Sequence, residues 1–344
     1  MAKSMKQVAA AAGVSVGTVS NVLNAPDKVA PATVDRVMAA IDQLGFVRND
    51  AARQLRAGRS RCIGLVVLDL GNPFFTDIAR GAEANAFERS LMVLSASTDD
   101  KPDRERLYLD TFDEQRVHGM LVSPVGENLS RLELLQSRGT PVVLVDRDGT
   151  GTPFSSVAVD DVAGGAMAVR HLCEQGRRRL AYVGGPSSLR QVADRLRGAR
   201  AAAQEFDGTE LEVVDTPELS VLAGRAAAAA IVDRAPQNRP DAIFCANDLL
   251  ALGVLQSLVL LGRSVVPDDI AVIGYDDIDF AASAVVSLSS VRQPSRDIGH
   301  AAVDLLERSV ADPSASPRHV RFEPTLTVRA STTAATPPAD TRTA

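Results

Sequence analysis

Cysteine is scarce in this chain of 344 residues, which contains three Cys and no C-x-x-C pair. Cys62, Cys173 and Cys245 lie far apart, each within or beside an apolar run, so we expect buried, reduced thiols and no disulfide framework. The chain also lacks an N-terminal apolar segment followed by a cleavage site, and no apolar stretch approaches membrane-spanning length. These absences predict a soluble, cytoplasmic protein without a membrane partner.

Signatures of enzymatic chemistry are missing as well. No G-x-G-x-x-G loop follows the first predicted strand, no G-x-x-x-x-G-K-[ST] motif occurs, and Gly184-Gly185-Pro186 is too short a signal for a phosphate site. The histidines are isolated, without metal-ligand spacing or a nucleophile partner; they are His118, His171, His300 and His319. We therefore expect no enzyme, no metal and no cofactor.

Positive charge is concentrated at the start of the chain. Residues 1–61 contain nine Lys or Arg against four Asp, a net charge of +5. Because the whole chain carries 37 basic and 43 acidic residues, residues 62–344 have a net charge of −11. The pI near 5.4 conceals this division. A basic segment of this kind is typical of a surface that meets phosphate groups.

The basic segment also predicts a compact three-helix unit. Lys6 to Ala12 can form one helix, Gly13-Val14-Ser15 a turn, and Val16 to Leu23 a second helix, which is the order of a helix-turn-helix. Ser15 is suited to cap the second helix, because its hydroxyl can accept a bond from a backbone N–H near Thr18. A third helix is predicted over residues 31–44 from apolar residues at helical spacing.

The outward face of the second helix is short, polar and uncharged, which suits close contact with a DNA groove. We assign base contacts to Val16, Gly17 and Asn21, and phosphate or mixed contacts to Thr18, Ser20 and Asn24. Asn21 can address an adenine edge with two hydrogen bonds. The alternative is a solvated three-helix bundle with ordinary surface charges.

Beyond residue 61, short apolar runs alternate with helical patterns. The predicted strands are residues 62–68, 91–95, 119–123, 142–145, 180–183, 242–245 and 270–274. The predicted helices include residues 75–89, 104–115, 162–175, 194–205, 222–235 and 248–261. This alternation predicts an α/β fold with two doubly wound lobes, each a parallel sheet covered on both faces.

Polar residues directly follow several of the apolar runs. Ligands of α/β sheets usually bind beyond the carboxyl ends of the strands, so these residues could converge in a cleft between the lobes. They are Asp69, Asp146, Asp160, Asn247 and Asp276, together with Arg195 at the start of a helix.

Several motifs in this order resemble those of lactose-repressor (LacI) family transcription factors. Residues 8–24, VAAAAGVSVGTVSNVLN, are similar to the opening of the family, and residues 49–56, NDAARQLR, to its hinge. Asn72-Pro73-Phe74-Phe75 resembles its first effector-site loop, and residues 245–248 and 273–277 resemble its later signatures. The likeness spans residues 5–330, and it implies two lobes like those of periplasmic sugar-binding proteins.

The resemblance implies an effector site and assigns residues to it. The implied contacts are Phe75, Asp146, Arg195, Asn247 and Asp276, with Phe74 and Asp160 as second contributors. Such groups hold hydroxyls and cover an apolar ligand face, which suits a sugar, a sugar derivative, a nucleoside or a nucleobase. The alternatives are that Asp160, Asp248 and Asp277 only cap helices or turns, and that the phenylalanines belong to the core. The sequence departs from some relatives at residues 191–194 and at Leu219, and it contains no Trp. These departures leave the identity of the ligand open.

Residues 50–56 are helix-compatible but too short to be stable alone in water. In the family, the residue matching Leu55 enters the minor groove, and those matching Ala51 and Ala52 lie at the close approach. Such a wedge unstacks a base step at a cost of roughly a few kcal/mol. Arg53 and Arg56 complete the DNA contacts expected of this segment. The alternative is a linker leucine that packs on the helix-turn-helix unit.

The expected organisation has five parts: a DNA-binding domain at 1–48, a hinge helix at 49–60, an N-lobe at 61–160 and 291–321, a C-lobe at 161–290 and 322–330, and a disordered tail at 331–344. No terminal leucine heptad is present, so we expect a homodimer on a near-palindromic operator.

The expected function is that of a repressor that binds double-stranded operator DNA in the cytoplasm, associated with the nucleoid when bound, under the control of a small polar effector. Two alternatives stay open. A sugar receptor for transport would bind ligand without DNA, and a degenerate enzyme with an added DNA-binding module would show turnover.

Overall fold

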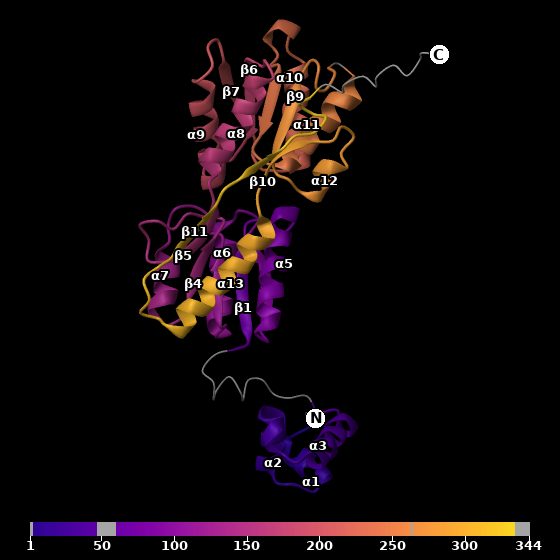
Figure 1. Ribbon diagram of the computed structural model, residues 1–344, viewed down its shortest axis with the longest axis vertical. Coiled ribbons are helices and arrows are strands. Elements are labelled where there is room, and N and C mark those ends of the chain that lie inside the picture. The colour runs from indigo at the N-terminus through magenta and orange to yellow at the C-terminus, as the bar shows by residue number, and fades with distance from the viewer. Residues whose placement is uncertain (1–2, 47–59, 263, 334–344) are drawn as a thin grey trace, which may run out of the picture. The chain divides into compact units, whose positions relative to one another are not determined.

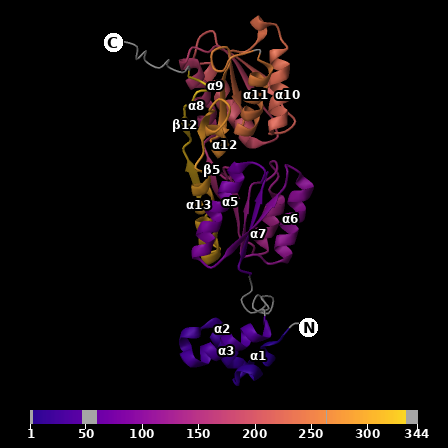
Figure 2. The ribbon, with the colours of Figure 1, turned by 90° about the vertical axis from the view of Figure 1, so that its right-hand side faces the viewer.

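The computed structural model describes residues 3–46, 60–262 and 264–333. The chain divides into two compact units between Ser60 and Arg61. Figures 1 and 2 show their elements. In the described ranges, no helix is both long and apolar enough to cross a membrane.

The first unit is the predicted helix-turn-helix with a third helix behind it. Its elements are α1 (Met5–Ala12), α2 (Val16–Asn24), the 3-10 turn η1 (Pro26–Lys28) and α3 (Pro31–Leu44). A capping box formed by Ser4 and Gln7 begins α1, and Gly13 ends it at φ 65°, a conformation that glycine adopts without strain. The helices close around a buried core that includes Val8, Val19 and Val37.

The second unit contains two six-stranded sheets. The sheet of the N-lobe has the order β11-β5-β4-β3-β1-β2 and is parallel throughout. Its strands are β1 (Cys62–Val67), β2 (Met92–Ser97), β3 (Gly119–Val122), β4 (Val142–Val145), β5 (Ser155–Val159) and β11 (His319–Phe322). Helices α5 (Pro73–Glu88) and α13 (Ser295–Ala311) cover one face, and α6 (Pro102–Glu114) and α7 (Ser130–Ser137) cover the other (Figure 2).

The sheet of the C-lobe has the order β12-β10-β9-β8-β6-β7. Its strands are β6 (Arg179–Gly184), β7 (Glu210–Asp215), β8 (Ala242–Cys245), β9 (Ala271–Asp276), β10 (Ser289–Arg292) and β12 (Thr325–Thr327). Its helices are α8 (Asp161–Glu174), α9 (Arg190–Ala203), α10 (Val221–Val232), η2 (Pro236–Asn238), α11 (Asp248–Leu261) and α12 (Asp279–Ala282). The α/β prediction is confirmed, except that the edge strand β12 runs antiparallel to β10.

The chain passes between the lobes after β5, after β10 and after β11, so each lobe is discontinuous in sequence. Two predicted boundaries differ slightly from this arrangement. Val291 and Arg292, expected in the N-lobe, pair with Tyr275 and Asp276 in the C-lobe sheet. Phe322, expected in the C-lobe, pairs with Val159 in the N-lobe sheet. Backbone pairing therefore shifts each lobe boundary by one or two residues from the position that the resemblance implied.

The prediction of a disordered tail is wrong at its first residues. Ser331 and Thr332 are buried, although the composition after residue 330 has no apolar periodicity. The Ser331 hydroxyl donates to the carbonyl of Val272 at 2.6 Å, and the Thr332 hydroxyl lies 2.8 Å from Nε2 of His171. Hydroxyl groups that satisfy buried polar partners hold this segment, which a search for apolar residues does not detect. The rest of the predicted tail lies outside the described residues.

Three helix pairs pack backbone to backbone through glycines. Each helix of the α5–α13, α8–α9 and α10–α11 pairs contributes one glycine at the crossing. A Cβ atom at Gly165 of α8 would lie 2.0 Å from the carbonyl oxygen of Arg195, and one at Gly198 of α9 would lie 1.9 Å from that of Val162. The absence of side chains at these positions therefore sets how closely α8 and α9 approach.

Candidate functional sites

The exposed face of α2 is the candidate DNA-reading surface. Val16 is 42% exposed, and Gly17 and Asn21 are also exposed. Thr18 and Ser20 are half-buried and take part in bonds within the unit. The Thr18 hydroxyl lies 2.9 Å from that of Ser15, whose oxygen also accepts from the Thr18 backbone N–H at 3.0 Å.

Asn24 is exposed, but its amide is already engaged. Its Nδ2 donates to the Ser20 carbonyl at 2.8 Å and to the Ser20 hydroxyl at 3.2 Å. The structure thus leaves Val16, Gly17 and Asn21 the freest to meet a base edge. The predicted hinge contacts lie outside the described residues; they are Ala51, Ala52, Arg53, Leu55 and Arg56.

A cavity of about 400 Å³, here called the site cavity, lies between the two lobes. This volume is in the range of small-molecule sites. Six of the seven predicted effector residues line it: Phe74, Phe75, Asp146, Arg195, Asn247 and Asp276. The phenylalanine rings are buried and meet edge to face, so they belong to the core and form part of the wall.

Asp160 is the predicted residue that does not line the site cavity. Its Oδ1 accepts from the backbone N–H of Ala163 at 2.9 Å and so caps α8. Its Oδ2 pairs with the guanidinium of Arg321. Asp160 therefore caps a helix, as the alternative interpretation proposed, because both of its oxygens are engaged away from the site cavity.

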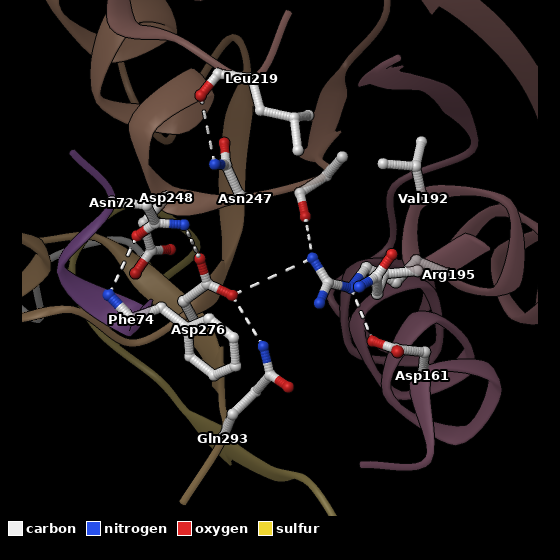
Figure 3. A network of polar contacts seen from close by, with 12 residues as sticks. Asn72, Phe74, Asp161, Val192, Arg195, Leu219, Asn247, Asp248, Asp276 and Gln293 are labelled. Atoms are coloured by element: carbon white, nitrogen blue, oxygen red, sulfur yellow. Dashed lines mark hydrogen bonds and ion pairs between the residues drawn. The ribbon is translucent and has the colours of Figure 1, made fainter. Parts of the chain in front are cut away.

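Arg195 is the buried cation of the site, 4% exposed on the first turns of α9. Its Nε donates to Oδ1 of Asp161 at 2.7 Å, and its Nη1 donates to the carbonyl of Ala246 at 2.7 Å (Figure 3). The guanidinium stacks on the ring of Tyr275, with its central carbon 3.7 Å from the ring centroid. Burial would lower the pKa of Arg195, but the carboxylates around it, Asp161 first, outweigh burial and raise it. The group therefore stays charged in a fixed orientation.

Asp276 ends β9 beside this guanidinium. Its Oδ1 lies 4.0 Å from Nη1 of Arg195 and accepts from Nε2 of Gln293 at 2.8 Å. Its Oδ2 accepts from Nδ2 of Asn72 at 3.1 Å, which joins the C-lobe to the N-lobe (Figure 3). Burial raises the pKa of Asp276 to about 6, although Arg195 and the two amides oppose this rise.

Asp146 follows β4 and is 3% exposed. Its Oδ2 accepts from Nε2 of Gln191 at 2.7 Å, a second hydrogen bond between the lobes. Its Oδ1 is buried and has no hydrogen-bond partner among the described residues. Burial, followed by the negative charge of Asp161, raises the pKa of Asp146 to about 8. An unsatisfied buried oxygen on a cavity wall is a group that a ligand can satisfy.

Asn247 caps α11 and also lines the site cavity. Its Oδ1 accepts from the N–H of Leu250 at 2.9 Å, and its Nδ2 donates to the carbonyl of Leu219 at 3.3 Å. The neighbouring Asp248 is fully buried and accepts from the N–H of Ile278 and the hydroxyl of Ser290. Asp248 is therefore structural, although Asn247 and not Asp248 caps α11.

Several side chains of the site were not predicted. Asp161 neutralises Arg195, Gln191 and Asn72 bond to the predicted carboxylates across the lobes, and Gln293 fixes Asp276. Asn72 belongs to the motif Asn72-Pro73-Phe74-Phe75 that resembles an effector-site loop, and Gln191 belongs to the segment 191–194 that departs from some relatives. Only Asp161 had a physical signal, since a buried guanidinium requires a carboxylate partner.

The site cavity thus presents fixed hydrogen-bond donors and acceptors, an arginine on an aromatic ring, and an apolar wall. Over the described parts of the chain, no group of three or more His, Cys, Asp or Glu is arranged to hold a metal ion. A helix-turn-helix unit followed along the chain by a two-lobed α/β body with such a cavity defines a ligand-responsive DNA-binding protein.

Comparison with known proteins identifies the family. Residues 4–49 match "Bacterial regulatory proteins, lacI family", and residues 169–332 match "Periplasmic binding protein-like domain". The HTH-type transcriptional regulator CelR of Thermobifida fusca is 36% identical over 341 residues, covering 95% of this chain and 97% of that protein. The ribose operon repressor of Escherichia coli (strain K12) is 32% identical over 333 residues, covering 95% and 99%. The chain belongs to the lacI family and is a DNA-binding transcriptional regulator.

Solved structures show the same fold. A CelR–cellobiose complex is 33% identical, with a TM-score of 0.69, and the match covers 96% of this chain and 99% of that one. A LacI family regulator from Enterococcus faecium with bound ribose is 26% identical, with a TM-score of 0.71, and the match covers 79% and 98%.

Proposed function

We propose that this chain is a repressor whose binding to operator DNA is controlled by a small polar effector held in the site cavity. One observation carries this proposal. Polar groups from both lobes, with Arg195, Asp146 and Asp276 at their centre, surround a volume of about 400 Å³ in which Oδ1 of Asp146 lacks a partner. A sugar, a sugar derivative, a nucleoside or a nucleobase supplies hydroxyl or amino donors of the required kind. The cellobiose and ribose in the similar structures support this class.

The proposed effector contacts are Phe74, Phe75, Asp146, Arg195, Asn247 and Asp276. Asn72 and Gln191 support these contacts, because their amides donate hydrogen bonds to Asp276 and Asp146 across the two lobes. An effector that takes over or strengthens these bridges favours one arrangement of the lobes. It changes DNA affinity only if its own affinity differs between the two arrangements. We infer that residues 49–60 transmit this difference.

DNA recognition is assigned to a homodimer acting in the cytoplasm, with Val16, Gly17 and Asn21 at base edges and the basic residues of the first unit at phosphates. Thr18, Ser20 and Asn24 fix the register. The predicted hinge contacts remain part of this proposal on sequence grounds. A two-fold dimer requires a near-palindromic operator.

The test begins with selection of bound fragments from random duplexes by the full chain. Operator affinity is then measured with and without cellobiose, D-ribose and adenosine, alongside calorimetric proof of effector binding. We expect a preferred near-palindrome and a change in its affinity only with bound effector.

A double variant tests whether the response depends on the site cavity. Arg195→Met with Asp161→Asn removes the buried ion pair as a unit, so that Asp161 is not left as an unpaired charge, while Asp276 keeps its hydrogen bonds from Asn72 and Gln293. This variant should fold and bind the operator but fail to respond to the effector. Unchanged operator affinity at proven effector saturation of the unmodified chain would contradict the proposed coupling.

A further inference from the structure

The site cavity is lined by an excess of carboxyl groups. Among the residues that the structure describes, two cations line it, Lys101 and Arg195. The acidic residues in its wall are Asp69, Asp99, Asp100, Asp146, Glu218 and Asp276. They come from both lobes, so a ligand in the site cavity faces carboxyl groups on both sides.

The buried arginine does not offset this excess, because its charge is already matched. Asp161 lies behind it at 2.7 Å and does not line the site cavity. Asp276 lies 4.0 Å away on the cavity side. The guanidinium can therefore orient a ligand hydroxyl with its remaining donors, but it brings no uncompensated positive charge for an anion.

The carboxyl groups of the N-lobe wall are mostly unmatched. Asp99 pairs with Arg104, which lies outside the site cavity wall. Asp69 and Asp100 form no ion pair with any of the residues that the structure describes. Lys101 is the remaining cation of the wall, and it is exposed to solvent.

Two buried oxygens show what the ligand must provide. Oδ1 of Asp146, on a residue more than nine-tenths buried, and Oδ1 of Asp100 both lack a hydrogen-bond partner among the described residues. Burial, then Asp69 and Asp99, raises the pKa of Asp100, as expected for a carboxyl group among like charges. Both oxygens are suited to ligand donors. Asp146, with its pKa raised to about 8, is uncharged near pH 7, so a phosphate or carboxylate would meet charge of the same sign on the other carboxyl groups of the wall.

We propose that the effector is a polyhydroxy compound, with or without an amino group, that carries no phosphate and no carboxylate. This inference rests on the proposed function and narrows it. It excludes sugar phosphates, sugar acids and nucleotides, and it retains free sugars, amino sugars and nucleosides.

The experiment offers the full chain an equimolar mixture of matched probes and identifies the retained compounds by native mass spectrometry. The uncharged or cationic probes are cellobiose, D-glucose, D-glucosamine, D-ribose and adenosine. Their anionic counterparts are D-glucose 6-phosphate, D-gluconate, D-ribose 5-phosphate and adenosine monophosphate. We expect retained compounds from the first set only, with anionic counterparts weaker by about 100-fold or more in calorimetry, because like charges in a desolvated site repel strongly.

The outcomes separate the two proposals. Preferential or equal retention of an anionic counterpart would overturn this inference and leave the proposed function standing. Retention of no probe would count against effector binding in the site cavity, and the inference would fall with it.

A charge variant tests the cause. Asp69→Asn with Asp100→Asn keeps side-chain size and should shrink the discrimination between a retained probe and its anionic counterpart by about tenfold. Asp103→Asn is the matched control, since its side chain is 91% exposed and lies outside the site cavity wall. Equal discrimination in the double variant and the control would overturn the role given to the N-lobe carboxyl groups.

Discussion

Asp146 and Asp276 each have two energetically unfavourable features, a buried carboxyl group and a strained backbone. Both carboxyl groups are buried, and both residues have a positive φ, 57° and 109°. Such backbone conformations cost on the order of 1–3 kcal/mol for residues other than glycine. The surrounding sheets hold these residues in place, and the orientation gained is that of two carboxyl groups toward one cavity.

Replacing the carboxyl group of Asp146 by an amide should stabilise the unliganded protein at neutral and higher pH. Its folded-state pKa of about 8 lies above the unfolded value, so the carboxyl group favours the folded state below the unfolded pKa, and this contribution is lost as pH rises through about 8. The melting temperature of Asp146→Asn should therefore rise relative to that of the unmodified chain as pH increases from 5 to 8.5. Each 1 kcal/mol of difference in unfolding free energy shifts the melting temperature by about 2–4 °C.

Melting temperatures of both proteins across this pH range measure the effect. Asp103→Asn, which changes an exposed carboxylate, should show no such trend. A gap between Asp146→Asn and the unmodified chain that narrows with rising pH would contradict the assignment.

Asn21 gives a residue-level test of DNA reading. Asn21→Ala should relax the base preference at one position of each half-site, at a cost of about 1–3 kcal/mol for the preferred base. Arg53→Ala should instead weaken all sequences alike, because phosphate contacts carry little sequence information. Parallel binding-site selections with the two variants compare these effects; an unchanged sequence preference for Asn21→Ala would refute base contact by this residue.

At the scale of elements, the crossing of α8 and α9 determines whether the site exists. Asp161 begins α8, and Arg195 lies on α9. Their 2.7 Å ion pair forms where Gly165 and Gly198 allow the two backbones to touch. The glycines thus position the cation without contacting a ligand.

Gly165→Ala should separate α8 from α9, because its Cβ would lie 2.0 Å from the carbonyl oxygen of Arg195. We expect a loss of about 1–3 kcal/mol in unfolding free energy and a further loss of effector affinity. Gly299→Ala is the control, since its Cβ meets the carbonyl oxygen of Ile78 at the same 2.0 Å in a different helix pair. Denaturant unfolding and calorimetry should show similar destabilisation in both, with weaker binding in Gly165→Ala; equal binding would argue against positioning.

Elements with a strong apolar pattern could be predicted from the sequence, and weakly patterned ones could not. β4 and β8 are fully buried, and their predicted bounds match the structure. β7, Glu210–Asp215, was missed because it is an edge strand in which no residue is buried and three of the six residues are acidic. In the site, Asp146 and Asn247 follow strands and Asp276 ends one, so the rule that ligands bind at the carboxyl ends of strands pointed to all three. Gln191 and Gln293 reach the site through tertiary contacts that no local pattern encodes.

At the scale of the whole body, side-chain contacts join the lobes. Besides the ion pair of Arg190 with Glu127, which does not line the site cavity, two hydrogen-bonded bridges between described residues of the cavity wall do so. They are Asn72 to Asp276 at 3.1 Å and Gln191 to Asp146 at 2.7 Å. A hydrogen bond of this type contributes about 0.5–1.5 kcal/mol net. Together they are large enough to bias an equilibrium between lobe arrangements without locking it.

The double variant Asn72→Ala with Gln191→Ala should shift the unliganded protein toward a more open arrangement. Small-angle X-ray scattering of the full chain should show a larger radius of gyration than the unmodified protein. Gln136→Ala is a suitable control, because its amide bonds within the N-lobe, to the carbonyl of Pro153 at 3.2 Å. Identical scattering from the double variant and the control would refute the bridging role.

The return of the chain to the N-lobe has a consequence for biosynthesis. α13 and β11, residues 295–311 and 319–322, complete a lobe whose first strand begins at Cys62. During synthesis on the ribosome, one edge of β5 stays unpaired until β11 has been made. Most of the C-lobe has been synthesised by then. A nascent chain arrested before His319 would therefore expose the backbone of β5, the kind of edge from which aggregation begins.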